Sequence, residues 1–184
     1  MRPCYAFIVL TGLLMLLRAM HPAGAEEQPS APAVPSVLRV PPGHTLLVKA
    51  EATGVQIYKS VAGPDRTLAW VLEAPLADLF SREGQKVGSH YAGPSWEARD
   101  GSTVTRDQAQ AVQTAAAPNA QHDIPWLLIK VQAVGDPEGA FTKVVYIQRV
   151  DTHGGQAPAE APRRAGTQVG VAYRAIYYFY GRAD

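Results

Sequence analysis

The feature that most limits this chain is a series of short apolar runs separated by turn residues, with no convincing amphipathic helix. Residues 55–61 alternate between two faces, and Gly63-Pro64-Asp65 then supplies a turn before the next run, which predicts a hairpin. We therefore expect an all-β fold, an antiparallel sandwich or barrel of about nine or ten short strands. The main expected strands fall at 45–50, 55–61, 67–73, 85–91, 95–99, 124–134, 141–150 and 171–180.

Two segments do not fit this alternation. Residues 105–122 are rich in Ala and Gln, but a helix there would have little apolar surface to bury, so we interpret them as a strand arm and a loop. Residues 151–170 contain Gly154-Gly155 and two prolines and predict a long loop before the last strand. A loop of that length is usually functional or mobile.

The first 25 residues have the pattern of a secretory signal. Arg2 precedes an apolar run at 5–17, and Ala23-Gly24-Ala25 is typical of a cleavage site. An uncleaved anchor is the alternative, but the run is shorter than the roughly 20 residues that a membrane span needs. We expect a signal peptide at 1–25, a flexible Pro-rich leader at 26–36 and a single all-β domain at 37–184. The protein would then be exported, to the periplasm or the extracellular space.

Composition excludes several classes of function. Cys4, the single cysteine, lies in the expected signal, so no disulfide is expected in the mature domain. Without Arg2 and Arg18 the 17 Lys and Arg become 15, against 16 Asp and Glu, which gives a net charge of −1. That balance does not favour a nucleic-acid partner. We expect no transmembrane span in the mature chain, no cofactor and no metal, because the histidines are scattered. The oligomeric state stays open.

The densest group of chemically active side chains lies at 88–102, and it supplies the catalytic candidates. His90 and Glu97 flank the turn at Gly93-Pro94, so their side chains are expected to approach each other, and Arg149 ends a later strand. A titratable pair of this kind suits general acid–base chemistry. In the alternative interpretation, which we favour, Glu97 pairs with Arg99 or Arg149 and His90 is a satisfied histidine at a strand edge.

Aromatic and charged side chains near the same turns are the candidates for ligand binding. Aromatic faces with a few polar groups are typical of small-molecule sites. The competing interpretation makes the rings core residues and Asp100-Gly101 a simple turn. The candidate ligand-binding residues are Tyr91, Trp96, Asp100, Arg149 and His153.

Five phrases together resemble a known family. They are VQIYKS (55–60), VGSHYAGPSWEARDGSTV (87–104), IPWLLIKV (124–131), YIQRVDTHGGQAP (146–158) and AYRAIYYFY (172–180). The chain resembles, over about residues 35–180, the secreted bacterial and fungal family called domain of unknown function 3455. The resemblance implies no established activity. It does imply that a disulfide of many members is lost here, where Lys59 and Arg163 or Arg164 stand, and that the 151–170 loop is freer.

Three functions remain open at this point. The first is an exported binding or interaction module for an unknown small molecule or glycan, with a site formed by 88–102 and 148–156. The second is an acid–base enzyme, a lyase or hydrolase, that uses His90, Glu97 and Arg149. The third is a structural protein of the cell envelope.

Overall fold

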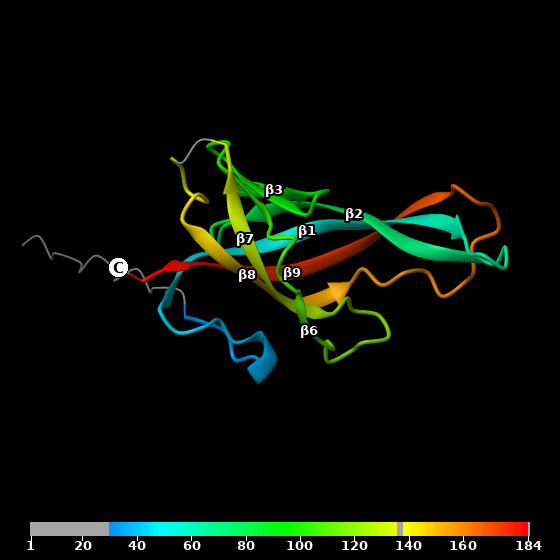
Figure 1. Cartoon of the computed structure of the whole chain (residues 1–184), viewed down its shortest axis with the longest axis horizontal. Helices are drawn as coiled ribbons and strands as arrows, with labels where there is room; N and C mark the ends of the chain where they lie inside the picture. Colours follow the sequence, from blue (N-terminus) through cyan, green and yellow to red (C-terminus); the bar gives the residue numbers. More distant parts are fainter. Residues whose placement is uncertain (1–29, 136–137, 184) are drawn as a thin grey trace, which may run out of the picture.

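The computed structural model describes residues 30–135 and 138–183. The expected signal peptide therefore lies outside the described residues. The described part contains one 3₁₀ turn, Ser36–Leu38, no α-helix, and nine antiparallel strands (Figure 1). The strands are β1 His44–Ala62, β2 Leu68–Phe80, β3 Lys86–Tyr91, β4 Ser95–Ala98, β5 Thr103–Arg106, β6 Gln113–Ala115, β7 Trp126–Val134, β8 Val144–Gly154 and β9 Gln168–Arg182.

Eight of these strands close into an antiparallel barrel. Strands β1 to β5 pair in chain order, β5 pairs with β7, and β7, β8 and β9 continue the order until β9 pairs with β1. The short strand β6 pairs with β7 and does not belong to the ring. Of the two all-β architectures expected, the structure adopts the barrel. Closure removes the free edges that an open sheet of this size would present.

The barrel interior is the main hydrophobic core. Phe141 and Phe179 stack with their ring centroids 4.6 Å apart, and Leu79, Val104 and Ile147 are fully buried. Inward-facing residues alternate with outward-facing ones along the strands, which is the period-two pattern that the sequence shows. The core therefore follows directly from the alternation of the strands.

A second apolar cluster lies on the outside of the barrel. Val150, Tyr178 and Tyr180 are buried there, and Val34 and Val40 from the N-terminal segment pack against them. Residues 30–40, called the strap below, therefore lie against the outer surface of β8 and β9. The part of the expected leader that the structure describes, residues 30–36, belongs to this strap.

Three strands continue beyond the barrel as an arm (Figure 1). Pairing of β2 with β3 begins only at Ala77, and pairing of β8 with β9 stops at Tyr173. Residues 55–62, 68–76 and 168–172 therefore form a three-stranded sheet of their own, which we call the arm. The loop at 155–167 runs along one face of the arm, and the Tyr58 hydroxyl donates to the Gly155 carbonyl over 2.8 Å.

Some strands are longer than the sequence predicts. The expected strands at 45–50 and 55–61 form the single strand β1, because Gly54 does not interrupt it. A side chain at Gly54 would collide with the backbone of Leu76 and Ala77, so this glycine permits a close approach of two strands and makes no turn. Strand β8 likewise continues through Gly154, which shortens the expected loop to 155–167.

The loop at 155–167 is fastened to the arm by hydrogen bonds to its own backbone groups. Ser60 N donates to Thr167 O and Gly166 N donates to Ser60 O, each over 2.8 Å. The Trp70 indole donates to the Glu160 carbonyl, also over 2.8 Å. These hydrogen bonds hold the loop in the region where the family resemblance implies a missing disulfide.

Candidate functional site

His90 points into the barrel and forms part of its core. Its side chain is 3% exposed, its Nδ1 lies 2.8 Å from the Ser95 carbonyl, and its ring stacks on Trp96 at 4.3 Å. The pKa of His90 is lowered to about 3, mainly by burial; the hydrogen bond to Ser95 acts in the opposite direction, and the positive charge of Arg149 adds to the lowering. His90 is therefore a neutral, satisfied histidine at ordinary pH.

The structure does not bring Glu97 together with His90. A two-residue turn at Gly93-Pro94 would place them opposite each other. The connection instead has three residues, 92–94, so His90 pairs with Trp96 and Glu97 pairs with Ser89. A register shift of one residue moves a side chain to the other face of the sheet. Glu97 therefore lies on the outer surface, where it accepts a 2.9 Å hydrogen bond from Tyr91.

Arg149 points into the barrel, as its strand neighbours Leu127 and Tyr177 do. It is 9% exposed, and its Nη2 donates to the Pro125 carbonyl over 2.8 Å. The charge of Arg149 influences the pKa of His90, so the two side chains share the interior. In the described part of the chain it makes no ion pair with Glu97. Of the three candidate catalytic residues, His90 and Arg149 therefore share the barrel interior, whereas Glu97 lies outside it.

Tyr91 and Asp100 make hydrogen bonds to residues close to them in the fold. The hydrogen bond to Glu97 raises the pKa of Tyr91. Asp100 accepts hydrogen bonds from Ser102 N and Ser102 Oγ and from Ala140 N, and the Ser102 hydroxyl is the main reason that the pKa of Asp100 is lowered. Asp100 therefore connects the β4–β5 turn to the chain before β8, which is the simple turn role considered above.

Trp96 lies in the interior, 2% exposed, while His153 lies outside. His153 lines an open groove of about 390 Å³ on the outer face of β1, β9 and β8. The groove forms where β8 has an irregular register between Val150 and His153 and where Asp151 adopts a positive φ of 48°. It contains groups of both charges, and its lining residues include Glu51, Thr53, Asp151, His153, Arg174 and Ile176.

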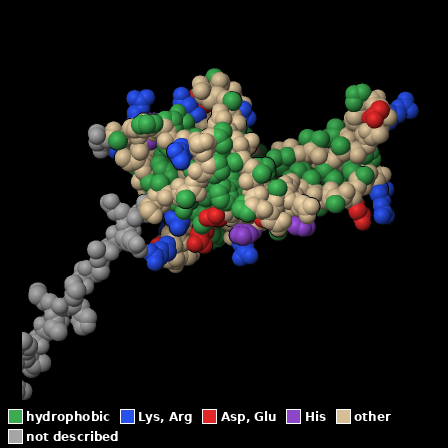
Figure 2. Space-filling model, turned by 90° about the horizontal axis from the view of Figure 1, so that it is seen from below, with side chains coloured by type: hydrophobic (Ala, Val, Ile, Leu, Met, Phe, Trp, Pro, Cys, Tyr) green, Lys and Arg blue, Asp and Glu red, His purple; other side chains and the backbone are tan. Residues whose placement is uncertain are grey.

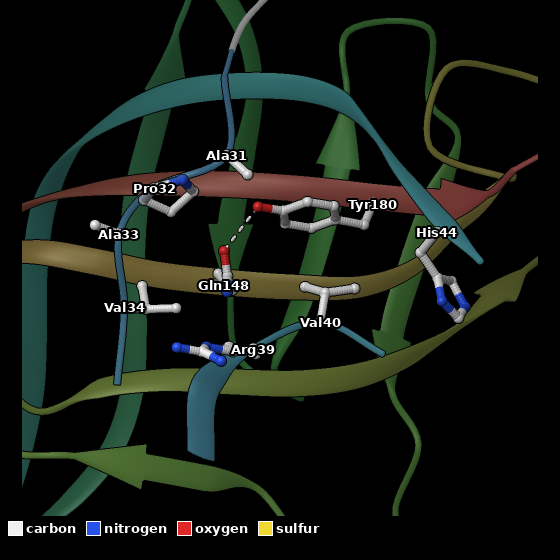
Figure 3. A pocket seen from close by; sticks show the side chains of 9 residues that line it. All are labelled: Ala31, Pro32, Ala33, Val34, Arg39, Val40, His44, Gln148 and Tyr180. Carbon is white, nitrogen blue, oxygen red and sulfur yellow. Dashed lines mark hydrogen bonds between the residues drawn. The ribbon is translucent and has the colours of Figure 1, made fainter. Parts of the chain in front are cut away.

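A larger hollow, also open to solvent and of about 450 Å³, lies between the strap and the outer surface of the barrel; it is called the strap pocket below (Figure 3). Its wall on the barrel side is formed by Gln148 of β8, Tyr180 of β9 and His44 at the start of β1, and its strap side is mainly apolar. Arg39 and His44 supply the ionisable groups of the lining. The remaining lining residues are Ala31, Pro32, Ala33, Val34 and Val40.

Gln148 fixes the geometry of this pocket. It is 2% exposed, its Nε2 donates to the Leu38 carbonyl over 2.5 Å, and its Oε1 accepts a 2.8 Å hydrogen bond from the Tyr180 hydroxyl. The Tyr180 ring points toward Gln148 across the pocket floor (Figure 3). One buried amide therefore joins the strap to two strands, so the pocket is a built feature of the fold.

Sequence reasoning did not find the strap pocket. The leader segment shows only a Pro-rich composition, which predicts flexibility and no contact with the domain. The one usable signal was Gln148, a polar residue within the apolar run 144–150, since a buried amide needs hydrogen-bond partners from elsewhere in the chain.

Within the described residues, no three or more His, Cys, Asp or Glu side chains are grouped so that they could hold a metal ion. No helix in that part of the chain is long and apolar enough to cross a membrane.

The fold and the pocket define a class: a small closed β-barrel with an open outer pocket, lined on one side by the strap, and a projecting arm. The chain belongs to the family described as protein of unknown function (DUF3455), whose sequence model matches residues 41–181. This match confirms the resemblance found in the sequence. No curated protein and no solved structure matches the chain.

Proposed function

We propose that the protein is an exported binding module whose ligand occupies the strap pocket. The observation that carries the proposal is the bridge formed by Gln148 between the Leu38 carbonyl and the Tyr180 hydroxyl. A short N-terminal segment is held over a pocket of about 450 Å³ by this bridge, and that volume is within the range of small-molecule sites. Export is supported by the signal-like first 25 residues.

The lining favours a small organic ligand with an apolar body and an anionic group. The strap contributes mostly short apolar side chains, which suit an aliphatic body. Arg39 is exposed at the rim and suits a carboxylate, because a guanidinium binds carboxylates through two parallel hydrogen bonds. His44, the other basic residue of the lining, lies apart from Arg39 (Figure 3) and has its Nδ1 2.9 Å from the Pro41 carbonyl.

The test is a thermal-shift series with hexanoate, hexanol and gluconate. Hexanoate carries both features, whereas hexanol lacks the charge and gluconate lacks the apolar body. We expect stabilisation by hexanoate that rises with its concentration, because a ligand that binds only the folded state shifts the unfolding equilibrium. Replacing Ala33, an exposed lining residue, by Phe should fill the pocket and abolish the shift.

Arg39→Gln should weaken the hexanoate effect and leave any hexanol effect unchanged. The matched control is Arg99→Gln, which removes an exposed arginine at the β4–β5 turn, outside the pocket lining. Equal responses to all three compounds, or an unchanged hexanoate effect in the Ala33→Phe variant, would exclude this pocket as the binding site.

No geometry favours the acid–base enzyme. His90 is buried on the inner face and Glu97 lies on the outer face, so this arrangement lends no support to the pair acting on one substrate.

A further inference from the structure

The arm has an open apolar edge that the rest of the fold does not use. Four of the seven large hydrophobic side chains found exposed among the described residues belong to the arm: Val61 of β1, and Val71, Leu72 and Leu76 of β2. In Figure 2 hydrophobic side chains cover much of the arm, and charged side chains gather near its far end. Concentration of exposed apolar side chains on one element is typical of an interaction surface.

Strand β2 supplies the edge. From Leu68 to Leu76 its sheet partner in the described structure is β1 alone, because pairing with β3 starts at Ala77. The backbone N–H and C=O groups on the other side of these residues therefore face away from the sheet. An exposed edge of this kind is completed by another extended strand.

The usual protections of an edge are weak between Leu68 and Ala74. This stretch contains neither lysine nor proline, and the protections that it has, the β-bulge at Glu73 and the following Pro75, lie at its end. Glu73 is its one charged residue, and that charge is balanced by Lys59 at 3.5 Å and is hydrogen-bonded by Gln168. The edge is therefore apolar and locally neutral, which offers little attraction to a charged partner.

We propose that the occupant of this edge is a second copy of the same chain, joined by antiparallel pairing of β2 with β2. Antiparallel pairing of two identical strands has twofold symmetry, so one edge completes the other without any further surface. The neutral apolar surface of Val71 and its neighbours then meets an identical neutral apolar surface. The product is a six-stranded sheet in the order β9-β1-β2-β2-β1-β9, with one barrel at each end.

The first test is the mass of the purified protein in solution, measured by light scattering after size-exclusion chromatography at about 200 µM. We expect a dimer. Val71→Lys should raise the dissociation constant at least about tenfold, because two like charges meet across the twofold axis. Val134→Lys is the matched control, since Val134 is 49% exposed, as Val71 is, but lies on β7 of the barrel. It should leave the dimer unchanged.

A second test uses single cysteines, with Cys4 replaced by Ser. Cysteines are placed one at a time at positions 69, 71, 72 and 73, with Val134→Cys as the control. A disulfide needs Cα atoms about 4.4–6.8 Å apart, and only a residue next to the twofold axis lies that close to its own copy. We expect crosslinking at one or two adjacent positions and none at 134.

Both tests can overturn the proposal. A monomer at about 200 µM excludes the second copy as the occupant, whatever else the arm binds. A dimer that Val71→Lys leaves intact places the contact elsewhere. A dimer in which no β2 cysteine crosslinks, or in which all of them do, excludes a fixed antiparallel β2–β2 register.

Discussion

The burial of His90 makes a quantitative prediction about stability and pH. In the folded barrel the pKa of His90 is lowered to about 3, whereas a histidine in the unfolded chain keeps a value near 6.5. Between these pH values His90 is protonated in the unfolded chain and neutral in the folded chain. The stability that depends on a neutral His90 is therefore complete above pH 6.5, falls as the pH drops below that value, and stops falling near pH 3.

The loss of unfolding free energy depends on how far below 6.5 the pH is taken. Each pH unit below 6.5 costs about 1.4 kcal/mol for one proton, so lowering the pH from 7 to 5 should remove about 2 kcal/mol. Other groups also titrate, so the quantity to measure is the difference in unfolding free energy between wild type and His90→Phe. A phenylalanine keeps a ring beside Trp96 but cannot take a proton.

The assay is urea unfolding followed by circular dichroism at pH 7 and pH 5. We expect the advantage of the wild type over His90→Phe to shrink by about 2 kcal/mol between the two. His153→Phe, at an exposed histidine of the outer groove, is the control and should show no comparable change. An advantage that is equal at both pH values within about 0.5 kcal/mol would refute the reasoning, since His90 would then protonate inside the folded barrel.

Two further predictions concern the loop at 155–167 and the strap. Gly155 and Gly166 both have a positive φ, 84° and 78°. A Cβ added at Gly155 would lie 2.9 Å from the Tyr173 Cβ, whereas a Cβ added at Gly166 would have no atom within 4 Å. Gly166→Ala should cost about 1 kcal/mol of unfolding free energy and Gly155→Ala about 1–3 kcal/mol more, and equal losses would contradict the steric argument. Gln148→Leu should cost about 2 kcal/mol, because it leaves the Leu38 carbonyl and the Tyr180 hydroxyl without their partner, and it should make residues 30–40 sensitive to limited proteolysis. A strap as protease-resistant as that of the wild type would show that other contacts hold it.

Local patterns predicted the β-structure well. The turns at Gly63-Pro64-Asp65 and Asp100-Gly101 connect neighbouring strands, and the two long apolar runs pair as β7 and β8. Turn residues act over a few positions, so a single sequence contains enough information to locate them. Closure of the barrel depends on pairs such as Thr103 with Val134, whose separation in the chain leaves no local signal.

The prediction that His90 and Glu97 meet was wrong because of the length of one turn. The sequence places His90 and Glu97 symmetrically around Gly93-Pro94, but the turn type fixes the register, and the composition of the turn did not reveal its third residue. Because side chains alternate, that single residue decides whether a carboxylate faces the barrel interior or the solvent. The strap pocket was missed for a different reason, since its barrel side brings together β8, β9 and the start of β1.

The pairing of β1 with β9 has a consequence for the order of folding. The ladder runs from His44 opposite Arg182 to Lys59 opposite Gln168. The first strand of the domain can therefore complete its pairing only when the last strand is present. Contacts between such distant segments carry a large entropic cost before they return any stability, and domains dominated by them fold in milliseconds to seconds. During synthesis the barrel therefore stays unclosed until the whole of β9 has emerged, and removing β9, Gln168–Arg182, would leave β1 and β8 each with one of its two strand neighbours missing.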